Sequence, residues 1–321
     1  MSNEQQSAIV QSPCVIFFGM RGTFSLLPLV ALLEAGIDVR AVVVPADAST
    51  PAERLPAVRQ GPGIQARMRL PVVRPYLERT IASIAWEHGI PVVEVGRLSD
   101  TRTIATLAAY RPDVIAVACF NQKLPPAILA LPPLGCLNVH PSLLPANRGP
   151  EPLFWTFRRG EAMTGVTVHL MDEELDAGDI IFQESLAVPD GITGDELERR
   201  AAALGGELLV RAIRALADGT ATRTPQQAER ASMYPYPAPE DFVVTPDRSA
   251  RWAFNFLRGA AHWRGPLAIQ VGEQRFPVAA ALDYAPDATL PAPFIQSGDE
   301  LWVQCTPGVV HVRVAGPAVF R

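Results

Sequence analysis

The amino-acid sequence predicts an α/β fold with a mostly parallel sheet, followed by a small β-barrel domain. Short apolar runs alternate with longer helical patterns through the amino-terminal part of the chain. A proline-rich stretch without periodicity follows at 218–241, and short apolar segments separated by Gly or Pro come after it. A chain of 321 residues also fits two domains better than one small core.

The first repeating unit sets the type of sheet. Residues 14–18 (CVIFF) predict a buried strand, residues 23–36 a helix that ends at a glycine, and residues 39–44 (VRAVVV) a second strand. A strand, a helix and a strand in this order predict parallel pairing with flanking helices, which is a Rossmann-like arrangement. The turn at 19–22 lacks the G-x-G-x-x-G pattern, and this argues against a nicotinamide-dependent dehydrogenase.

An insertion rich in Pro and Arg occupies residues 45–80. Two glutamates, Glu53 and Glu78, accompany its arginines, which are Arg54, Arg59, Arg67, Arg69, Arg74 and Arg79. Two interpretations remain open for this segment. It is either a solvated surface loop and helix, or a loop that contacts an anionic acceptor.

The alternation then continues to the proline-rich linker. Strands are predicted at 91–95, 113–120, 135–140, 166–171 and 180–188, with helices near 101–110 and from a Thr193–Glu196 capping box to about 217. The predicted boundaries are 1–217 for a catalytic domain, 218–241 for the linker and 242–321 for a β-barrel-like domain. In this last domain Thr245-Pro246 is expected to start a helix that runs through Arg258, before the short apolar segments.

Composition narrows the class of protein. Hydrophobic residues make up 48% and charged residues 19% of the chain, which predicts a soluble globular protein. A net charge of −5 argues against a broad nucleic-acid-binding surface. The cysteines form no CxxC pair, so no metal is expected. The N-terminus lacks the features of a signal peptide, and no stretch predicts a membrane span, so a cytoplasmic protein without membrane association is expected.

Three polar residues form the candidate catalytic group. Asn138 and His140 end the predicted strand 135–140 on one face, and Asp176 follows 36 residues after His140 in the string LDAGD. The amide can hold a developing oxyanion, the imidazole can shuttle a proton, and the carboxylate can orient the imidazole and stabilise its charged form. Together they suffice to move an acyl group between nitrogens without a serine or cysteine nucleophile. The other histidines are interpreted as structural, namely His88, His169, His262 and His311.

At these residues the chain resembles the folate-dependent formyltransferases. The motifs NVHPSLLP (138–145), Arg148-Gly149, TGVT (164–167) and LDAGD (175–179) occur in the order found in that family. The resemblance implies transfer of a formyl group from 10-formyltetrahydrofolate, with Asn138, His140 and Asp176 as the catalytic residues. The tail after residue 241 resembles the OB-like barrel of the enzymes that act on methionyl-tRNA.

The resemblance also implies binding residues around the catalytic group. The folate is expected to contact the loop after the strand 113–120 and the loop before Asp176, through Phe120, Lys123, Leu124, Glu173, Glu174 and Leu175. Lys123 meets the glutamate tail of the folate in an alternative arrangement. Ser142 borders the active site, and Arg148 either contacts the acceptor or stabilises its loop.

The identity of the acceptor is less determined than the donor. Methionyl-tRNA is the leading expectation, because the two-domain layout fits it, with Arg248, Arg251, Arg258 and Arg264 as the candidate basic cluster. The strings HPS and RGPEPLFW depart from that subfamily, and HPS with Trp155 resembles formyltransferases that act on amino sugars of nucleotide sugars. Glu151 adds negative charge near the expected acceptor. A 10-formyltetrahydrofolate hydrolase with water as acceptor and a non-catalytic binding module are the alternatives from other classes.

Overall fold

The computed structural model describes residues 12–47, 50–61 and 79–315. The chain divides into two compact units, each made of several segments. The first contains Met1–His140, Thr167–Gln183 and Ala202–Gln226. The second contains Pro141–Val166, Glu184–Ala201 and Gln227–Arg321. The domain boundaries predicted at 217 and 241 stay a prediction.

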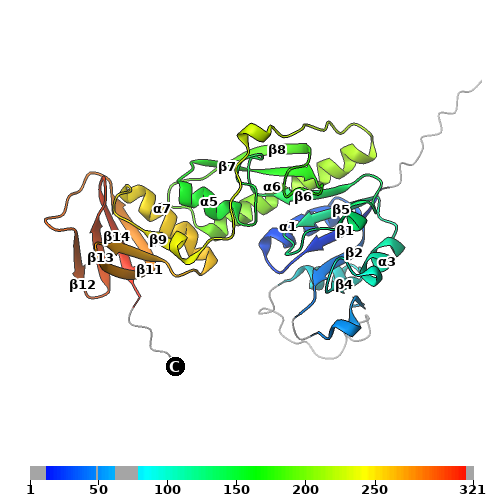
Figure 1. Ribbon diagram of the computed structural model, residues 1–321, viewed down its shortest axis with the longest axis horizontal. Helices are drawn as coiled ribbons and strands as arrows, with labels where there is room; N and C mark the ends of the chain where they lie inside the picture. Colours follow the sequence, from blue (N-terminus) through cyan, green and yellow to red (C-terminus); the bar gives the residue numbers. More distant parts are fainter. Residues whose placement is uncertain (1–11, 48–49, 62–78, 316–321) are drawn as a thin grey trace, which may run out of the picture. The chain divides into compact units, whose positions relative to one another are not determined.

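An eight-stranded sheet has the order β3-β4-β2-β1-β5-β6-β7-β8 (Figure 1). The strands β4, β2, β1, β5 and β6 pair in parallel, while β3 is antiparallel to β4 and β7 is antiparallel to β6. This confirms the predicted α/β fold with a mostly parallel sheet. The strands are β1 (Cys14–Gly19), β2 (Asp38–Pro45), β3 (Ala57–Arg59), β4 (Val92–Val95), β5 (Val114–Ala118), β6 (Cys136–His140), β7 (Met163–Leu170) and β8 (Ile180–Ala187).

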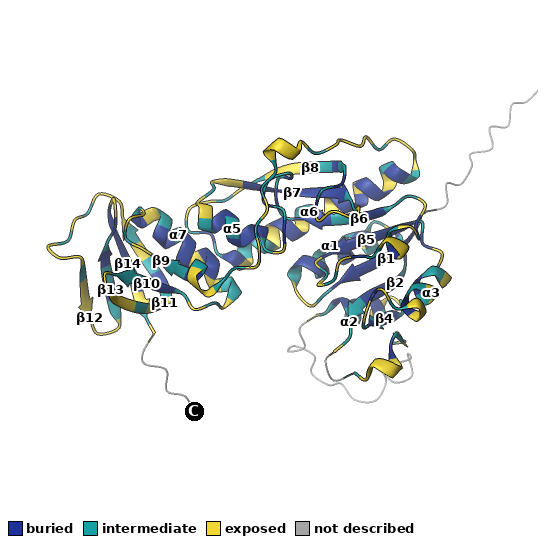
Figure 2. Ribbon diagram, in the orientation of Figure 1, coloured by how far each residue is buried: buried dark blue, intermediate teal, exposed yellow. Residues whose placement is uncertain are grey.

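The core of the first unit lies on the central strands. Every residue of β1 and β5 is buried, which accounts for their unbroken apolar sequence, since both faces of a parallel sheet are covered. Figure 2 shows these strands in dark blue. Leu107 and Ile128, from two flanking helices, complete the cluster. The helices before β6 are α1 (Thr23–Glu34), α2 (Ile81–Glu87), α3 (Thr101–Ala109) and α4 (Pro126–Leu129), with the 3-10 turn η1 (Ala52–Arg54).

Two later helices test the predicted helix starts. The helix α6 (Gly194–Ala217) begins where expected, and the Thr193 hydroxyl accepts the Glu196 amide at 3.3 Å, whereas the Glu196 carboxylate pairs with Arg199 and Arg200. The helix α7 (Ala250–Ala260) starts later than the predicted Thr245-Pro246. That prediction was wrong because Ser249 is the N-cap, and its hydroxyl accepts the Trp252 amide at 3.2 Å.

A second sheet of six strands has the order β12-β13-β14-β11-β10-β9. It provides the β-structure predicted for the C-terminal region, and α7 packs against β11 and β14. Its strands are β9 (Val243–Val244), β10 (Ala268–Val271), β11 (Gln274–Ala285), β12 (Phe294–Ser297), β13 (Glu300–Gln304) and β14 (Val309–Val314). The remaining elements of this unit are α5 (Pro152–Arg159), η3 (Ala228–Arg230), η4 (Pro239–Phe242) and η5 (Ala261–Trp263).

The described part of the arginine-rich insertion is short. Arg59, in β3, pairs with Glu94 of β4, with 2.7 Å between Nε and Oε1. Arg79 pairs with Glu87 of α2 at 3.0 Å. Arg67, Arg69, Arg74 and Glu78 lie outside the described residues, so contact with an anionic acceptor stays a prediction for this segment. Among the helices that are described, none combines the length and apolar character needed to cross a membrane.

His262 is held between two carboxylates in the second unit. Its Nδ1 lies 2.7 Å from Oδ1 of Asp195, and its Nε2 lies 2.9 Å from Oε2 of Glu198. The hydrogen bond to Glu198, followed by the one to Asp195, raises the pKa of His262 from 6.5 to about 9 against an opposing effect of burial. The imidazolium therefore connects η5 to the first turns of α6.

This raised pKa predicts a pH-dependent stability. The folded state binds the proton more tightly than the unfolded chain, so the stabilisation is fully present below pH 6.5 and is lost as pH rises through about 9. We expect urea unfolding at pH 6, 7, 8 and 9 to show a steeper loss of stability for the wild type than for His262→Gln. His88→Gln is the matched control and should keep the wild-type slope. Equal slopes for wild type and His262→Gln would contradict the prediction.

Candidate active site

The strand β6 delivers two of the predicted catalytic side chains. Asn138 and His140 are two residues apart and therefore point to the same face, at the edge of the sheet where the parallel strands end. His140 is buried, with 4% of its surface exposed, whereas Asn138 is half-buried. The strand CLNVH therefore contributes apolar side chains to the hydrophobic core, and its Asn138 and His140 contribute polar side chains to the candidate site.

The antiparallel neighbour β7 adds a residue that sequence reasoning missed. Asn138 is directly opposite His169, and His140 is opposite Thr167. Residues opposite each other in such a pair share a face of the sheet. His169, which the sequence analysis interpreted as structural, therefore lies on the same face as Asn138. The alternation of VTVHLM indicates which strand residues share a face. The pairing register that puts His169 opposite Asn138 is not visible in the sequence.

A tight turn after β7 carries Asp176. Its φ of 54° lies in the left-handed region, and a Cβ at Gly178 would overlap the carbonyl oxygen of Leu170. The side-chain amide of Gln226 donates to the carbonyls of Asp176 and Gly178, at 2.9 and 2.8 Å. Backbone hydrogen bonds between Ile180 and Thr224 hold this segment beside the start of β8. Gln226 lies in the stretch 218–241 that the sequence predicts to be a linker, and no sequence pattern indicates its role at this turn.

The structure brings the three predicted catalytic residues together in the first unit. The Asp176 carboxylate, 8% exposed, has its Oδ2 3.7 Å from Nδ1 of His140. Its Oδ1 lies 3.7 Å from Nε2 of His169 and accepts a hydrogen bond of 3.4 Å from Nδ2 of Asn138. The rings of His140 and His169 are 6.5 Å apart and nearly perpendicular.

This arrangement has the groups that acyl transfer to an amine needs. An imidazole that takes a proton becomes a cation, and a carboxylate beside it stabilises that charge. An amide nitrogen can donate to an oxygen that becomes negative in the transition state. Because the groups are largely shielded from water, these electrostatic interactions are stronger than on an exposed surface.

The residues predicted to bind folate occupy two loops of the first unit. Phe120 is half-buried and packs edge-on against Phe18, with 5.2 Å between the ring centroids. Leu124 is buried in the core, whereas Lys123 is exposed. On the loop before Asp176 the exposed residues are Glu173, Glu174 and Leu175.

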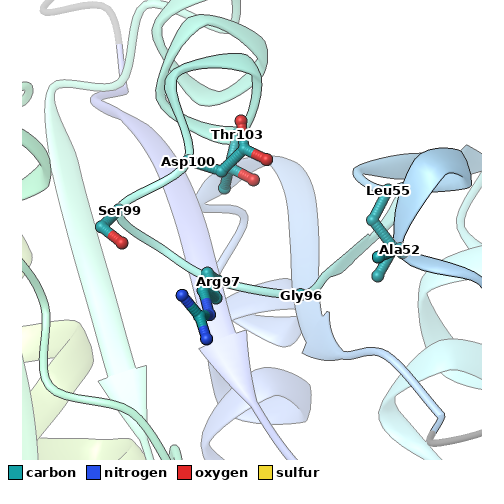
Figure 3. A pocket seen from close by; sticks show the side chains of 7 residues that line it. All are labelled: Ala52, Leu55, Gly96, Arg97, Ser99, Asp100 and Thr103. Carbon is teal, nitrogen blue, oxygen red and sulfur yellow. The ribbon is translucent and has the colours of Figure 1, made fainter.

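A polar hollow lies at the carboxyl end of β4, which the sequence did not indicate. Its volume is about 390 Å³, and Figure 3 shows Leu55 on one side with Asp100 and Thr103 on the other. The remaining lining residues are Ala52, Gly96, Arg97 and Ser99. Gln122 ties the loop after β5 to this loop, since it donates to the Gly96 carbonyl at 2.7 Å and accepts the Leu98 amide at 3.2 Å.

Ser142 and Arg148 lie in the second unit. Ser142 is fully buried, and its hydroxyl donates to the Ala146 carbonyl at 2.7 Å, which closes the SLLP turn. The backbone N–H of Arg148 donates to the Ser232 carbonyl at 2.8 Å, and the Arg148 carbonyl accepts the Tyr234 N–H at 3.0 Å.

Steric crowding explains why a glycine follows Arg148. Gly149 has a φ of 112°, and a Cβ there would overlap the carbonyl oxygen of Tyr234. The RG motif therefore has a backbone role in this unit.

Glu151 is engaged within the same unit. Trp263 donates its indole N–H to Oε2 of Glu151 at 2.7 Å. Burial is the largest effect on this carboxyl and raises its pKa. The carboxylate that the sequence analysis expected near the acceptor is therefore hydrogen-bonded to Trp263.

Comparison with known proteins places the chain in a family. Residues 14–213 match the formyl transferase family. The methionyl-tRNA formyltransferase of Pelotomaculum thermopropionicum is 37% identical over 251 residues, which is 78% of this chain and 73% of the relative. The corresponding protein of Synechococcus sp. (strain JA-3-3Ab) is 44% identical over 176 residues, 54% of this chain, and that alignment spans about half (55%) of the relative. The chain belongs to the formyl transferase family.

A solved structure supports the same fold. The N-formyltransferase from Helicobacter canadensis, in complex with folinic acid and dTDP-3-aminofucose, superposes with a TM-score of 0.65. The match covers 95% of this chain and 99% of that protein at 13% identity, so it demonstrates a shared fold. Family membership and the formyltransferase class of enzyme, both predicted from the sequence, are confirmed by these comparisons.

The hydrogen bonds of Gln226 predict an effect on activity. Gln226→Ala removes both bonds to the turn that carries Asp176, so the carboxylate loses its fixed position beside His140. We expect kcat for formyl transfer to fall by about tenfold, because small displacements of a catalytic group are costly. Gln227→Ala, a change at the exposed neighbour, is the control and should keep wild-type kcat. Wild-type kcat in Gln226→Ala would show that the turn keeps its shape without these bonds.

Proposed function

We propose that this protein transfers the formyl group of 10-formyltetrahydrofolate to a primary amine, with the amino group of methionyl-tRNA as the leading acceptor. The observation that supports it most is the Asp176 carboxylate, which lies 3.7 Å from His140 and within hydrogen-bonding distance of Asn138. The relatives named methionyl-tRNA formyltransferase favour that acceptor.

In the proposed reaction His140 accepts a proton from the acceptor amine as its nitrogen attacks the formyl carbon. A carbon–nitrogen bond forms, and the formyl oxygen takes the electron pair of its double bond, with an Asn138 N–H donating to it. Asp176 stabilises the imidazolium. Collapse of the intermediate breaks the bond to N10 of the folate, and His140 returns the proton to that nitrogen. The products are the N-formyl amine and tetrahydrofolate.

We assign donor binding to the loops at this edge of the first unit. Phe120 offers an aromatic surface, and the exposed Lys123 can meet a carboxylate of the glutamate tail. Leu124 supports the shape of its loop from the core, and backbone groups of the loop with Glu173, Glu174 and Leu175 contact the pteridine. The polar hollow after β4, with Arg97 and Asp100, can meet further polar groups of the donor.

An amino sugar of a nucleotide sugar is the second candidate acceptor. The chain has HPS where the methionyl-tRNA formyltransferases usually have His-Ala-Ser or His-Gly-Ser, and it carries Trp155 on α5. Trp155 stacks on Tyr234 with ring centroids 4.9 Å apart, and its indole N–H donates to the Pro235 carbonyl at 3.0 Å. Arg148, on the preceding loop, remains the proposed acceptor-side residue for either substrate, and Ser142 supports that loop through its hydrogen bond to the Ala146 carbonyl.

Substitution of the three catalytic residues tests the mechanism. We expect His140→Ala and Asp176→Ala to abolish formyl transfer with the fold retained, and Asn138→Ala to reduce kcat by about 10²–10³-fold, the typical loss for one oxyanion donor. Circular dichroism and the melting temperature report folding, and tetrahydrofolate release reports turnover. His311→Ala, in the C-terminal sheet, is the control. Near-wild-type turnover in His140→Ala or Asp176→Ala would refute the mechanism.

An acceptor panel tests the substrate. Release of tetrahydrofolate from 10-formyltetrahydrofolate is measured with initiator methionyl-tRNA and, separately, with nucleotide-linked amino sugars. Turnover with the charged tRNA alone supports the leading proposal, and turnover with a sugar alone replaces it with the second. Release that needs no acceptor would identify a hydrolase, and no release under any condition would favour a binding module.

A further inference from the structure

His169 has both ring nitrogens in defined contacts. It is 1% exposed, and its Nδ1 lies 2.9 Å from the carbonyl oxygen of Leu170. A carbonyl only accepts hydrogen bonds, so this nitrogen carries the proton. In the neutral ring the other nitrogen, Nε2, is then an acceptor, and its neighbour at 3.2 Å is Nδ2 of Asn138.

The contacts of Asn138 define which end of its amide faces inward. Its Nδ2 lies 3.2 Å from Nε2 of His169 and 3.4 Å from Oδ1 of Asp176. With the amide turned over, its oxygen would face a carboxylate oxygen and a ring lone pair, and all three groups are acceptors. The amide nitrogen is therefore the end that satisfies this pocket.

The two acceptors lie on one side of the amide nitrogen. Nε2 of His169 and Oδ1 of Asp176 are themselves only 3.7 Å apart. One N–H of a planar amide can face this pair, and the second N–H, about 120° away in the same plane, is then directed elsewhere. The direction of the second N–H, and therefore whether it can reach the substrate, depends on how firmly the first N–H is held.

We propose that His169 is a positioning residue that fixes the Asn138 amide, so that the second N–H of Asn138 points at the oxyanion. This inference rests on the proposed formyl transfer. His169 does not touch the reacting atoms in this role. It acts through Asn138, and its effect should appear in kcat and depend on the presence of the amide.

A double-mutant cycle tests this dependence. His169→Met fills the space without a strong acceptor and should lower kcat by about tenfold, with both KM values within about twofold of wild type. His169→Gln offers an acceptor oxygen and should recover most of the lost activity. In the Asn138→Ala background, His169→Met should cause no further loss, because the group it positions is absent.

The opposite results would overturn the proposal. An equal loss from His169→Met with and without Asn138 would mean that the two residues act independently. A higher KM with unchanged kcat would indicate a binding role instead. A loss shared by His169→Met and His169→Gln, with a matching fall in melting temperature, would reduce His169 to a packing residue.

A readout independent of turnover separates this inference from the proposed function. Nitrogen NMR of the neutral His169 ring in the wild-type protein should show a protonated Nδ1 and an unprotonated Nε2. The side-chain NH₂ resonances of Asn138 should shift in His169→Met and remain near wild type in His169→Gln. A ring protonated on Nε2 would refute the positioning role, whereas correct resonances without turnover on any acceptor would refute the proposed function alone.

Discussion

A buried carboxylate is the constraint on which the site depends. Asp176 is 8% exposed, and a charge removed from water requires hydrogen bonds or opposite charge to offset the lost hydration. The strand β6 meets this requirement, because Nδ2 of Asn138 donates to the carboxylate at 3.4 Å and Nδ1 of His140 lies 3.7 Å from it. The residues that satisfy the carboxylate are also those that can handle a proton and an oxyanion, so the electrostatic requirement of the fold and that of the chemistry coincide.

The position of that carboxylate is fixed from a distant part of the sequence. Asp176 adopts a left-handed conformation, which costs on the order of 1–2 kcal/mol for a residue with a Cβ. Two hydrogen bonds from Gln226 and the Ile180–Thr224 pairing offset this cost. A segment with the composition of a linker therefore belongs to the support of the catalytic turn. The same turn needs Gly178, because the Leu170 carbonyl approaches its backbone closely.

The residues expected near the acceptor make structural contacts within the second unit. Gly149 accommodates the Tyr234 carbonyl, and Glu151 accepts the Trp263 indole N–H. The Glu151 carboxylate is therefore engaged by a residue of its own unit. Trp155, on α5, stacks on Tyr234 and donates its indole N–H to the Pro235 carbonyl, so it holds part of the predicted linker against α5. Glu151 and Trp155 both have contacts within the second unit, so these two residues do not by themselves identify an acceptor.

The sequence by itself determined the class of fold and the candidate catalytic group. Alternating apolar and helical periods are local signals, and they correctly predicted the parallel sheet, α6 and the C-terminal strands. The spaced motifs around Asn138, His140 and Asp176 indicated the family. Only the tertiary structure decided the parts that depend on non-local pairing: the register that places His169 opposite Asn138, and the return of Gln226 to the catalytic turn. It also revealed Ser249 as the cap of α7, because a capping residue is defined by its backbone geometry and several polar residues nearby could have served. Periodicity reports which face a residue occupies, and only the folded chain decides what lies across from it.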